Sequence, residues 1–222
     1  ETIAWDIAQG LNAQTLDLSR GGLNPLQNTV HLVKPDGVDG NNNNASPHQT
    51  IQDAINAAVS GDTVVVGPGT YGGFTLNKSI KVIGPNGELS GNSSDRGSEA
   101  TIQGEIDVAA DGAEIAGLEI VTPEDVNDAP IDLGNAADVT IRNNVVEGGS
   151  STGGIQPWTS ANGVTGTVTI TGNQVSDGAI GLYVGGDGTT VDVTGNDING
   201  AGDEGLWLVD GTNGPGLSSA TL

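Results

Sequence analysis

Carboxylate side chains lie at one point of a repeating pattern in the middle of the chain. Asp107 and Asp132 each follow an isoleucine in equivalent segments 25 residues apart, and Glu105 comes two residues before Asp107. Carboxylate oxygens are the ligands that Ca²⁺ prefers in proteins. These three residues therefore form a candidate calcium site, and Ca²⁺ is the one cofactor that the sequence suggests. The alternative is a solvated acidic face without a metal.

A second group of oxygen ligands occurs near the beginning of the chain. Asp36 and Asp39 lie in the run Asp36-Gly37-Val38-Asp39-Gly40-Asn41, whose spacing is typical of calcium loops. The run lacks the closing glutamate of an EF-hand loop. A turn without metal is the alternative interpretation and the one we favour.

A general base is missing beside the carboxylates. Proton abstraction needs a basic side chain within reach of the substrate, and no lysine or arginine falls on the strand face of Asp107 and Asp132. Lys81 and Arg142 map to outward positions of a different strand series. His31 and His48 lie in the N-terminal region and are expected to be surface or capping residues. The sequence therefore predicts no catalytic residue.

Three of the six aromatic residues recur near one face of the repeat. Trp158, Tyr183 and Trp207 occupy neighbouring units, and Gln156 lies beside them. Exposed aromatic side chains on a polar surface mark contact sites. They could stack on sugar rings, with Gln156 as a polar partner, or pack against another subunit. The alternative is that the long loops around them cover their rings.

Two independent series of apolar residues set the positions of these side chains. The first combines two alternating apolar residues, an asparagine and a further apolar residue, and it occurs at Val139, Ile141, Asn144 and Val146, at Val168, Ile170, Asn173 and Val175, and at Val191, Val193, Asn196 and Ile198. A fourth copy has Leu118 in the asparagine position. The second series, with steps of 24 to 26 residues, is Ile106, Ile131, Ile155, Ile180 and Leu206.

Alternating apolar and polar residues indicate strands with one buried face. Units of about 25 residues that stack in parallel would bury these faces as one continuous column, and no single unit would be stable alone. Asn144, Asn173 and Asn196 fit a tight turn, where asparagine accepts a left-handed backbone angle and can bond to the asparagine one unit away. The pattern predicts an all-β solenoid.

A short amphipathic helix precedes the repeat. Ser46 and Pro47 are a favourable N-cap and first helical residue, and Ile51, Ala54, Ile55 and Ala58 form one apolar face. We expect a helix over about residues 47–59 that covers the open end of the core. The first buried strand is expected at residues 64–66.

The residues around this helix carry a family resemblance, through the segments Thr50-Ile51-Gln52-Asp53-Ala54-Ile55-Asn56-Ala57-Ala58, Gly61-Asp62-Thr63-Val64-Val65-Val66, Pro68-Gly69-Thr70-Tyr71 and Ser79-Ile80-Lys81-Val82-Ile83-Gly84. The chain resembles the pectin-lyase-like superfamily over residues from about 29 to 222. The resemblance implies a right-handed, single-stranded parallel β-helix of about six to seven coils. It also implies that the ligand-facing strands are those of the second apolar series.

The superfamily hosts many activities, so its fold does not fix a function. The glutamate that pectin methylesterases carry after the Gly-Thr-Tyr motif is absent after Tyr71. The Asn-Thr-Asp and Gly-His-Gly motifs of polygalacturonases are absent as well. The resemblance therefore supports the fold more strongly than any one reaction.

Composition restricts the partners of the chain. It has 28 acidic and six basic residues, for a formal net charge of −22. Such a surface repels phosphate backbones and anionic lipid, which argues against nucleic acids and membrane surfaces as partners. No apolar run is long enough to insert into a membrane. The excess of aspartate and scarcity of lysine resemble proteins of halophiles; an ordinary acidic secreted protein is the alternative.

The two ends suggest self-association. Residues 1–28 form an extension in which Ile3, Trp5 and Ile7 alternate like a strand, and Leu217 begins another unit of the repeat. Head-to-tail stacking, donation of the N-terminal strand and continuation of the natural chain all remain open. We expect a non-catalytic extracellular module, such as a cell-surface, filament, adhesin or viral spike component, with itself, other surface proteins or a glycan as partner. The alternative is a calcium-dependent lyase or carbohydrate esterase acting on polyuronates.

Overall fold

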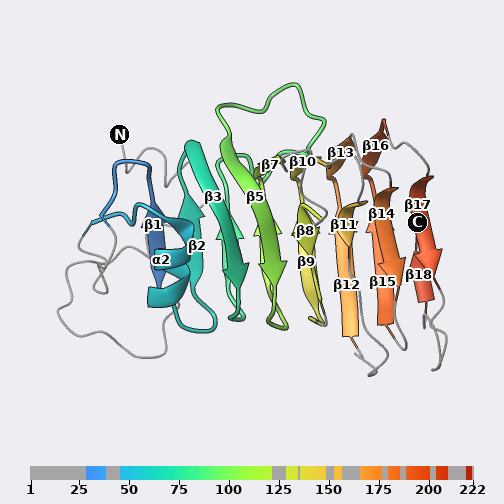
Figure 1. The fold of residues 1–222 in the computed structure, drawn as a ribbon, viewed down its shortest axis with the longest axis horizontal. Coiled ribbons are helices and arrows are strands. Elements are labelled where there is room, and N and C mark those ends of the chain that lie inside the picture. The colour runs from blue at the N-terminus through green and yellow to red at the C-terminus, as the bar shows by residue number, and fades with distance from the viewer. Residues whose placement is uncertain are drawn as a thin grey trace.

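The computed structural model is mostly β and describes residues 29–38, 46–121, 129–134, 136–148, 153–156, 166–176, 180–185, 189–200, 204–209 and 219–221. All strand pairs in these ranges are parallel. The strands lie side by side along the long axis of the molecule (Figure 1). Trp158, Asp39 and the predicted assembly residues Ile3, Trp5 and Ile7 lie outside the described residues.

An eight-stranded sheet forms one side of the fold. Its order is β1 (Val30–Val33), β2 (Thr63–Val66), β4 (Lys81–Ile83), β6 (Glu114–Ala116), β9 (Val139–Arg142), β12 (Gly166–Thr171), β15 (Thr189–Thr194) and β18 (Ser219–Thr221). After β1 and β2, every second or third strand of the chain returns to this sheet in the same direction. The sheet therefore gains one strand with each unit of the sequence repeat.

The second sheet contains the remaining strands, in two arms that meet at β5. Its order is β16 (Asp197–Asn199), β13 (Gln174–Ser176), β10 (Val145–Glu147), β7 (Glu119–Val121), β5 (Ala100–Val108), β8 (Ile131–Asp132), β11 (Gly153–Gln156), β14 (Ile180–Gly185) and β17 (Glu204–Val209), with β3 (Gly69–Leu76) paired to β5. The first half of β5 pairs with β7 and the second half with β8. Gly104, at φ +127°, lies between the two halves, where a side chain would be strained.

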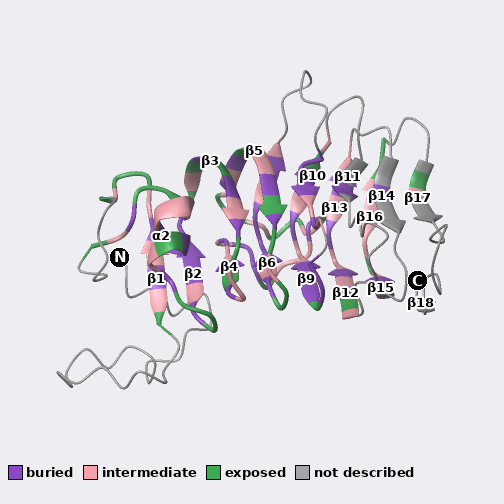
Figure 2. Cartoon of the chain, turned by 60° about the horizontal axis from the view of Figure 1, so that its bottom comes forward, coloured by how far each residue is buried: buried purple, intermediate pink, exposed green. Residues whose placement is uncertain are grey.

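The predicted apolar columns form the core. Val82, Ile115, Ile141, Ile170 and Val193 are register partners on consecutive strands of the first sheet and are all buried. Figure 2 shows buried residues distributed along the strands through most of the fold. Burial of each such side chain contributes roughly 1.5–3 kcal/mol, so the column stabilises the stack as a whole.

The asparagines of the repeat form a ladder in which Asn144 and Asn173 are buried and Asn196 is half-buried. The Nδ2 of Asn144 donates to the Oδ1 of Asn173 at 3.0 Å, and the Nδ2 of Asn173 donates to the Oδ1 of Asn196 at 2.9 Å. The same oxygens accept the backbone N–H groups of Asn144 and Asn173. The ladder begins at Leu118, whose N–H donates to the Oδ1 of Asn144.

The backbone angle at these turns differs from the prediction. The left-handed residue is the one before each ladder position, namely Gly117, Asn143, Gly172 and Gly195. The asparagines themselves are needed for their amide groups, which bond carbonyl groups of the coil before them. The Gly or Asn that precedes each ladder position is the sequence signal for this arrangement.

The predicted helix is present but shorter than expected. Helix α2 spans Ile51–Ala57, and its N-cap is Thr50, whose side chain accepts the N–H of Asp53, rather than Ser46. Ser46 and Pro47 instead lead into His48, which forms a parallel bridge to Val33. The helix contacts β1, β2 and β3 and lies at the end of the stack formed by β1 and β2, as Figure 1 shows. Its predicted apolar face, Ile51, Ala54, Ile55 and Ala58, is buried.

Strand β1 precedes the strand predicted to be first. It pairs with β2 in parallel and buries His31 and Val33. The sequence does not indicate this strand, because the alternation suggests that Val30 and Leu32 face the core. In the structure they are half-buried, and His31 and Val33 are the buried residues. At the other end, Ala220 and not Leu217 is the partner of Val191.

Candidate functional site

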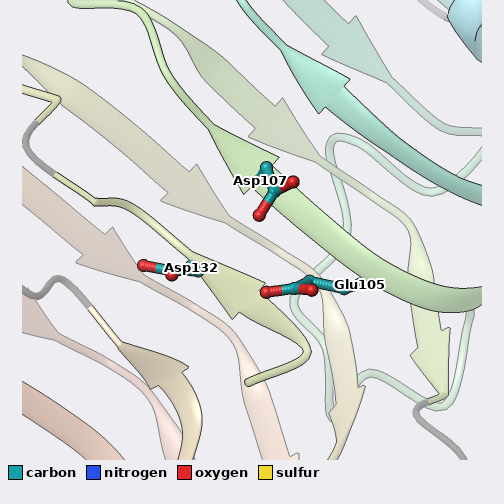
Figure 3. Close-up of side chains that lie close together, drawn as sticks. All are labelled: Glu105, Asp107 and Asp132. Atoms are coloured by element: carbon teal, nitrogen blue, oxygen red, sulfur yellow. The ribbon is translucent and has the colours of Figure 1, made fainter. Parts of the chain in front are cut away.

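The three carboxylates of the candidate calcium site lie together on the outer face of the second sheet. Glu105 and Asp107 come from β5 and Asp132 from β8, and Asp107 and Asp132 are register partners. Each offers one oxygen such that all three atoms lie within 4.8 Å of one another. Asp107 is exposed, and Glu105 and Asp132 are half-buried. Figure 3 shows the three side chains on these two neighbouring strands.

An open pocket adjoins this cluster. It is lined by Thr75, Asp107, Val108, Ala109, Asp111, Asp132, Gly134 and Ala136. The hydroxyl of Thr75 donates to Asp107 at 3.3 Å, and the N–H of Gly134 donates to Asp132 at 2.8 Å. Asp111 accepts the N–H of Ala137 at 2.8 Å. These bonds orient the carboxylates and leave other carboxylate oxygens of the pocket for a cation or a polar ligand.

Thr75 and Asp111 were not predicted as part of the site. Thr75 reaches it because β3 pairs with β5, which places Thr75 opposite Asp107. Asp111 belongs to the turn after β5, and its carboxylate accepts the N–H of Ala137 in the next coil. The Asp111-Gly112 pair marks a turn in the sequence, but only the stacking shows that this turn borders the pocket.

Like charges in the cluster repel one another. Two unit charges at about 4 Å interact by roughly 1 kcal/mol in water and more where solvent is excluded. A divalent cation or a high salt concentration would relieve this repulsion. The arrangement can therefore bind a hard cation, or it can be an acidic surface that salt stabilises.

The polar column continues from Asp132 to Gln156, but its register then differs from the prediction. Gln156 pairs with Asp132. Ile155 pairs with Leu182 and not with Ile180. Because side chains alternate with period two, a slip of two residues keeps the same face buried. The apolar pattern alone cannot distinguish Ile180 from Leu182.

This register brings two aromatic positions together. Tyr183 and Trp207 are register partners on β14 and β17. Tyr183 follows Leu182 as Gln156 follows Ile155, so the strand positions of Asp107, Asp132, Gln156, Tyr183 and Trp207 form one row along the second sheet.

Four basic side chains of the described residues form hydrogen bonds or ion pairs away from this row. The Nζ of Lys78 donates to three carbonyl groups at the end of α2. Lys81 and Arg142 both bond Glu114 on the first sheet. Arg96 pairs with Glu99. These four residues have structural contacts instead of positions beside the carboxylate cluster.

The histidines are buried at the N-terminal end. His31 bonds Asp62 at 3.0 Å and His48 bonds Asp53 at 2.6 Å, and the two rings lie 5.9 Å apart. Asp62 also accepts the N–H groups of Thr29 and Val59. These contacts join β1, α2 and the start of β2, which gives the histidines a role in covering the end of the core.

Asp36 lies near this end and not beside the cluster of Glu105. Asp36 is exposed. Burial of the Tyr71 hydroxyl, together with the nearby negative charge of Asp36, raises the pKa of Tyr71 to about 12. The hydroxyl of Tyr71 donates to the carbonyl of Gly67 at 2.8 Å. Tyr71 is therefore a neutral packing residue at the start of β3.

Comparison with known proteins gives one family. The family described as "Protein of unknown function (DUF1565)" matches residues 35–200. No curated protein and no solved structure matches the chain. Within the described residues, no helix has the length and apolar character required to cross a membrane.

Proposed function

Because the chain belongs to the DUF1565 family, which is associated with parallel β-helix proteins, we propose that it is a right-handed parallel β-helix of the pectin-lyase-like type that serves as a non-catalytic module at the cell surface. The parallel pairing of all described strands supports this architecture. So does the asparagine ladder, which repeats once per coil. About six to seven coils of the sequence repeat would build the solenoid.

The observation that carries the non-catalytic assignment is the position of six basic side chains within the described residues. Lys78, Lys81, Arg96 and Arg142 are held by α2, Glu114 and Glu99. His31 and His48 are buried against Asp62 and Asp53. A polyuronate lyase needs a base at the carbon that loses its proton, and none of these six side chains is available to the carboxylate pocket.

The row of strand positions from Asp107 to Trp207 is the contact surface that we assign to this module. Its first part is acidic and its last part carries the aromatic positions Tyr183 and Trp207. Aromatic rings and polar groups in one row suit a sugar chain or the surface of another protein. The net charge of −22 favours an extracellular, salty environment.

A polyuronate-degrading enzyme is the competing function, and the cluster of Glu105, Asp107 and Asp132 is what favours it. The two functions separate in one screen. The protein is incubated with pectate and alginate, with Ca²⁺ or with a chelator, and unsaturated products are followed by ultraviolet absorbance. We expect no product under either condition.

The matched control is the double variant Asp107→Asn with Asp132→Asn. Product that requires Ca²⁺ and disappears in this variant would overturn the non-catalytic assignment. Self-association is tested separately, by measuring the molar mass of the protein by light scattering in 2–3 M salt. A mass larger than that of one chain is expected if the module associates with itself.

A further inference from the structure

The connection between β4 and β5 is far longer than its counterparts. It comprises residues 84–99, whereas two residues join β6 to β7, β9 to β10, β12 to β13 and β15 to β16. We call residues 84–99 the strap. In Figure 1 it arches over the ends of β7 and β10. The long connection was not expected from the sequence, where only the family-like segment up to Gly84 stood out.

The strap bonds several later turns in succession. The N–H of Gly84 donates to Ala116 at 2.8 Å, and Asn143 donates through its Nδ2 to Gly87 at 2.8 Å. Further along, the N–H of Gly91 donates to Gly172 at 2.8 Å. At the tip, the Nδ2 of Asn92 donates to Asp197 at 3.3 Å. The strap thus crosses four consecutive coils, on the outside of the turns that hold the asparagine ladder.

Backbone lies directly on backbone along this path. A Cβ added at Gly91 would lie 2.3 Å from the N of Gln174 and 2.4 Å from the O of Asn144. A Cβ at Gly117 would lie 2.1 Å from the N of Gly87. Asn86, Gly87 and Gly91 are buried. The contact is therefore close packing that depends on glycine, and not a loose loop above the surface.

Arg96 fastens the strap to the coils. Its side chain is 7 % exposed. Nη1 donates to the carbonyls of Leu89 at 3.1 Å and Asn143 at 2.8 Å, while Nε and Nη2 bond Glu99. One buried guanidinium group thus joins the two arms of the strap and ties them to the turn between β9 and β10.

We propose that the strap is a clamp that makes the coils from β6 to β16 unfold as one unit. In a solenoid each repeat contacts only its neighbours, so opening can start at an end and proceed coil by coil. The strap adds contacts between residues up to 105 positions apart. Separation of the coil of β15 and β16 then requires the strap contacts to break as well. This inference follows from the contacts alone and is independent of the proposed function.

The direct test replaces residues 84–99 with a Gly-Asn pair, the turn used after β12. Amide hydrogen exchange is then compared by mass spectrometry in peptides from β12 to β16 and from β1 to β2. We expect exchange in the β12–β16 peptides to become about tenfold faster or more, because their local opening no longer requires the strap contacts to break. Exchange near β1 and β2 should change little.

Point variants carry the test if the shortened chain does not fold. Arg96→Ala removes the fastening, and Gly91→Ala forces the strap away from Asn144 and Gln174. The matched control is Gly97→Ala, also in the strap, where a Cβ would approach only the side chain of Asn86 at 3.9 Å. Gly72→Ala is a second control, since a Cβ there meets nothing within 4 Å.

The clamp predicts faster exchange from β12 to β16 in Arg96→Ala and Gly91→Ala and unchanged exchange in both controls. Wild-type protection of these peptides in the strap variants would overturn it. Equal acceleration in every peptide, including those of β1 and β2, would also overturn it, because this result indicates general destabilisation and not loss of a clamp.

Discussion

Several polar residues of this protein join one coil of the stack to the next. The asparagine ladder shows this, since the side-chain amides of Asn144, Asn173 and Asn196 make three, five and three hydrogen bonds. The role of Asn144, Asn173 and Asn196 in bonding between coils was predictable from their spacing. The left-handed angle was assigned to the wrong residue, because Asn tolerates that angle and a sequence does not show which of two adjacent residues adopts it.

Replacement of a ladder asparagine should be costly. Asn173→Ala removes the acceptor of the Asn144 N–H, one of the two acceptors of the Asn144 Nδ2, and the side-chain donor to the carbonyl of Ile141. Because buried polar groups left unpaired cost about 1–3 kcal/mol each, we expect a loss of about 3 kcal/mol in the free energy of unfolding. Chemical denaturation measures it. The control Asn77→Ala, at an exposed turn, should change stability by less than about 0.5 kcal/mol, and a similar loss in both variants would contradict the ladder.

Glu114 gives the fold a defined acid sensitivity. Burial alone would raise its pKa, but hydrogen bonds from Lys81 and Arg142, and the attraction of their charges, outweigh burial and hold the pKa below 4.5. A depressed pKa stabilises the fold above the unfolded-state value, and this contribution is lost as the pH falls through the folded-state value. We therefore expect the difference in melting temperature between wild type and Glu114→Gln to be largest at neutral pH and to shrink below about pH 4.5. A difference that stays constant down to pH 3 would contradict this role.

At the scale of elements, the sequence was most informative where the repeat is regular. The positions of β9, β12 and β15 follow from the Val and Ile pairs that begin at Val139, Val168 and Val191. The pairing of β14 was wrong by two residues, since Ile180 and Leu182 are equally apolar and lie on the same face. The strap was missed because no local pattern shows that a connection crosses four coils.

The helix α2 depends on a distant lysine for its C-terminal end. The ammonium of Lys78 donates to the carbonyls of Ile55, Asn56 and Ala58 at 2.7–2.8 Å. Lys78→Met keeps the apolar stem and removes these bonds, so we expect it to cost about 1–2 kcal/mol of stability. Thermal melting followed by circular dichroism would measure this. Lys81→Met, which removes an exposed ammonium group, is the control, and it should have the smaller effect.

The whole molecule is dominated by its charge. With a net charge of −22, the folded chain repels itself at low ionic strength. Because the Debye length falls from about 10 Å at 0.1 M salt to about 3 Å at 1 M, the melting temperature should rise by several degrees between these concentrations. The rise should be the same with KCl and with NaCl. Asp107→Asn should be more stable than wild type at low salt and about equally stable at 1 M salt. A wild-type melting temperature that does not change with salt would contradict the expected adaptation to high salt.

The strap has a consequence for how such a chain can change in evolution. Solenoids commonly vary by gaining or losing whole repeats, because each new unit only has to match its neighbours. Here a segment of fixed length touches Ala116, Asn143, Gly172 and Asp197 in order. A repeat duplicated or deleted between β6 and β16 would shift these contacts by one strand spacing of about 4.8 Å. The strap therefore fixes the number of repeats in this stretch, and changes in repeat number should occur outside the region from β4 to β16.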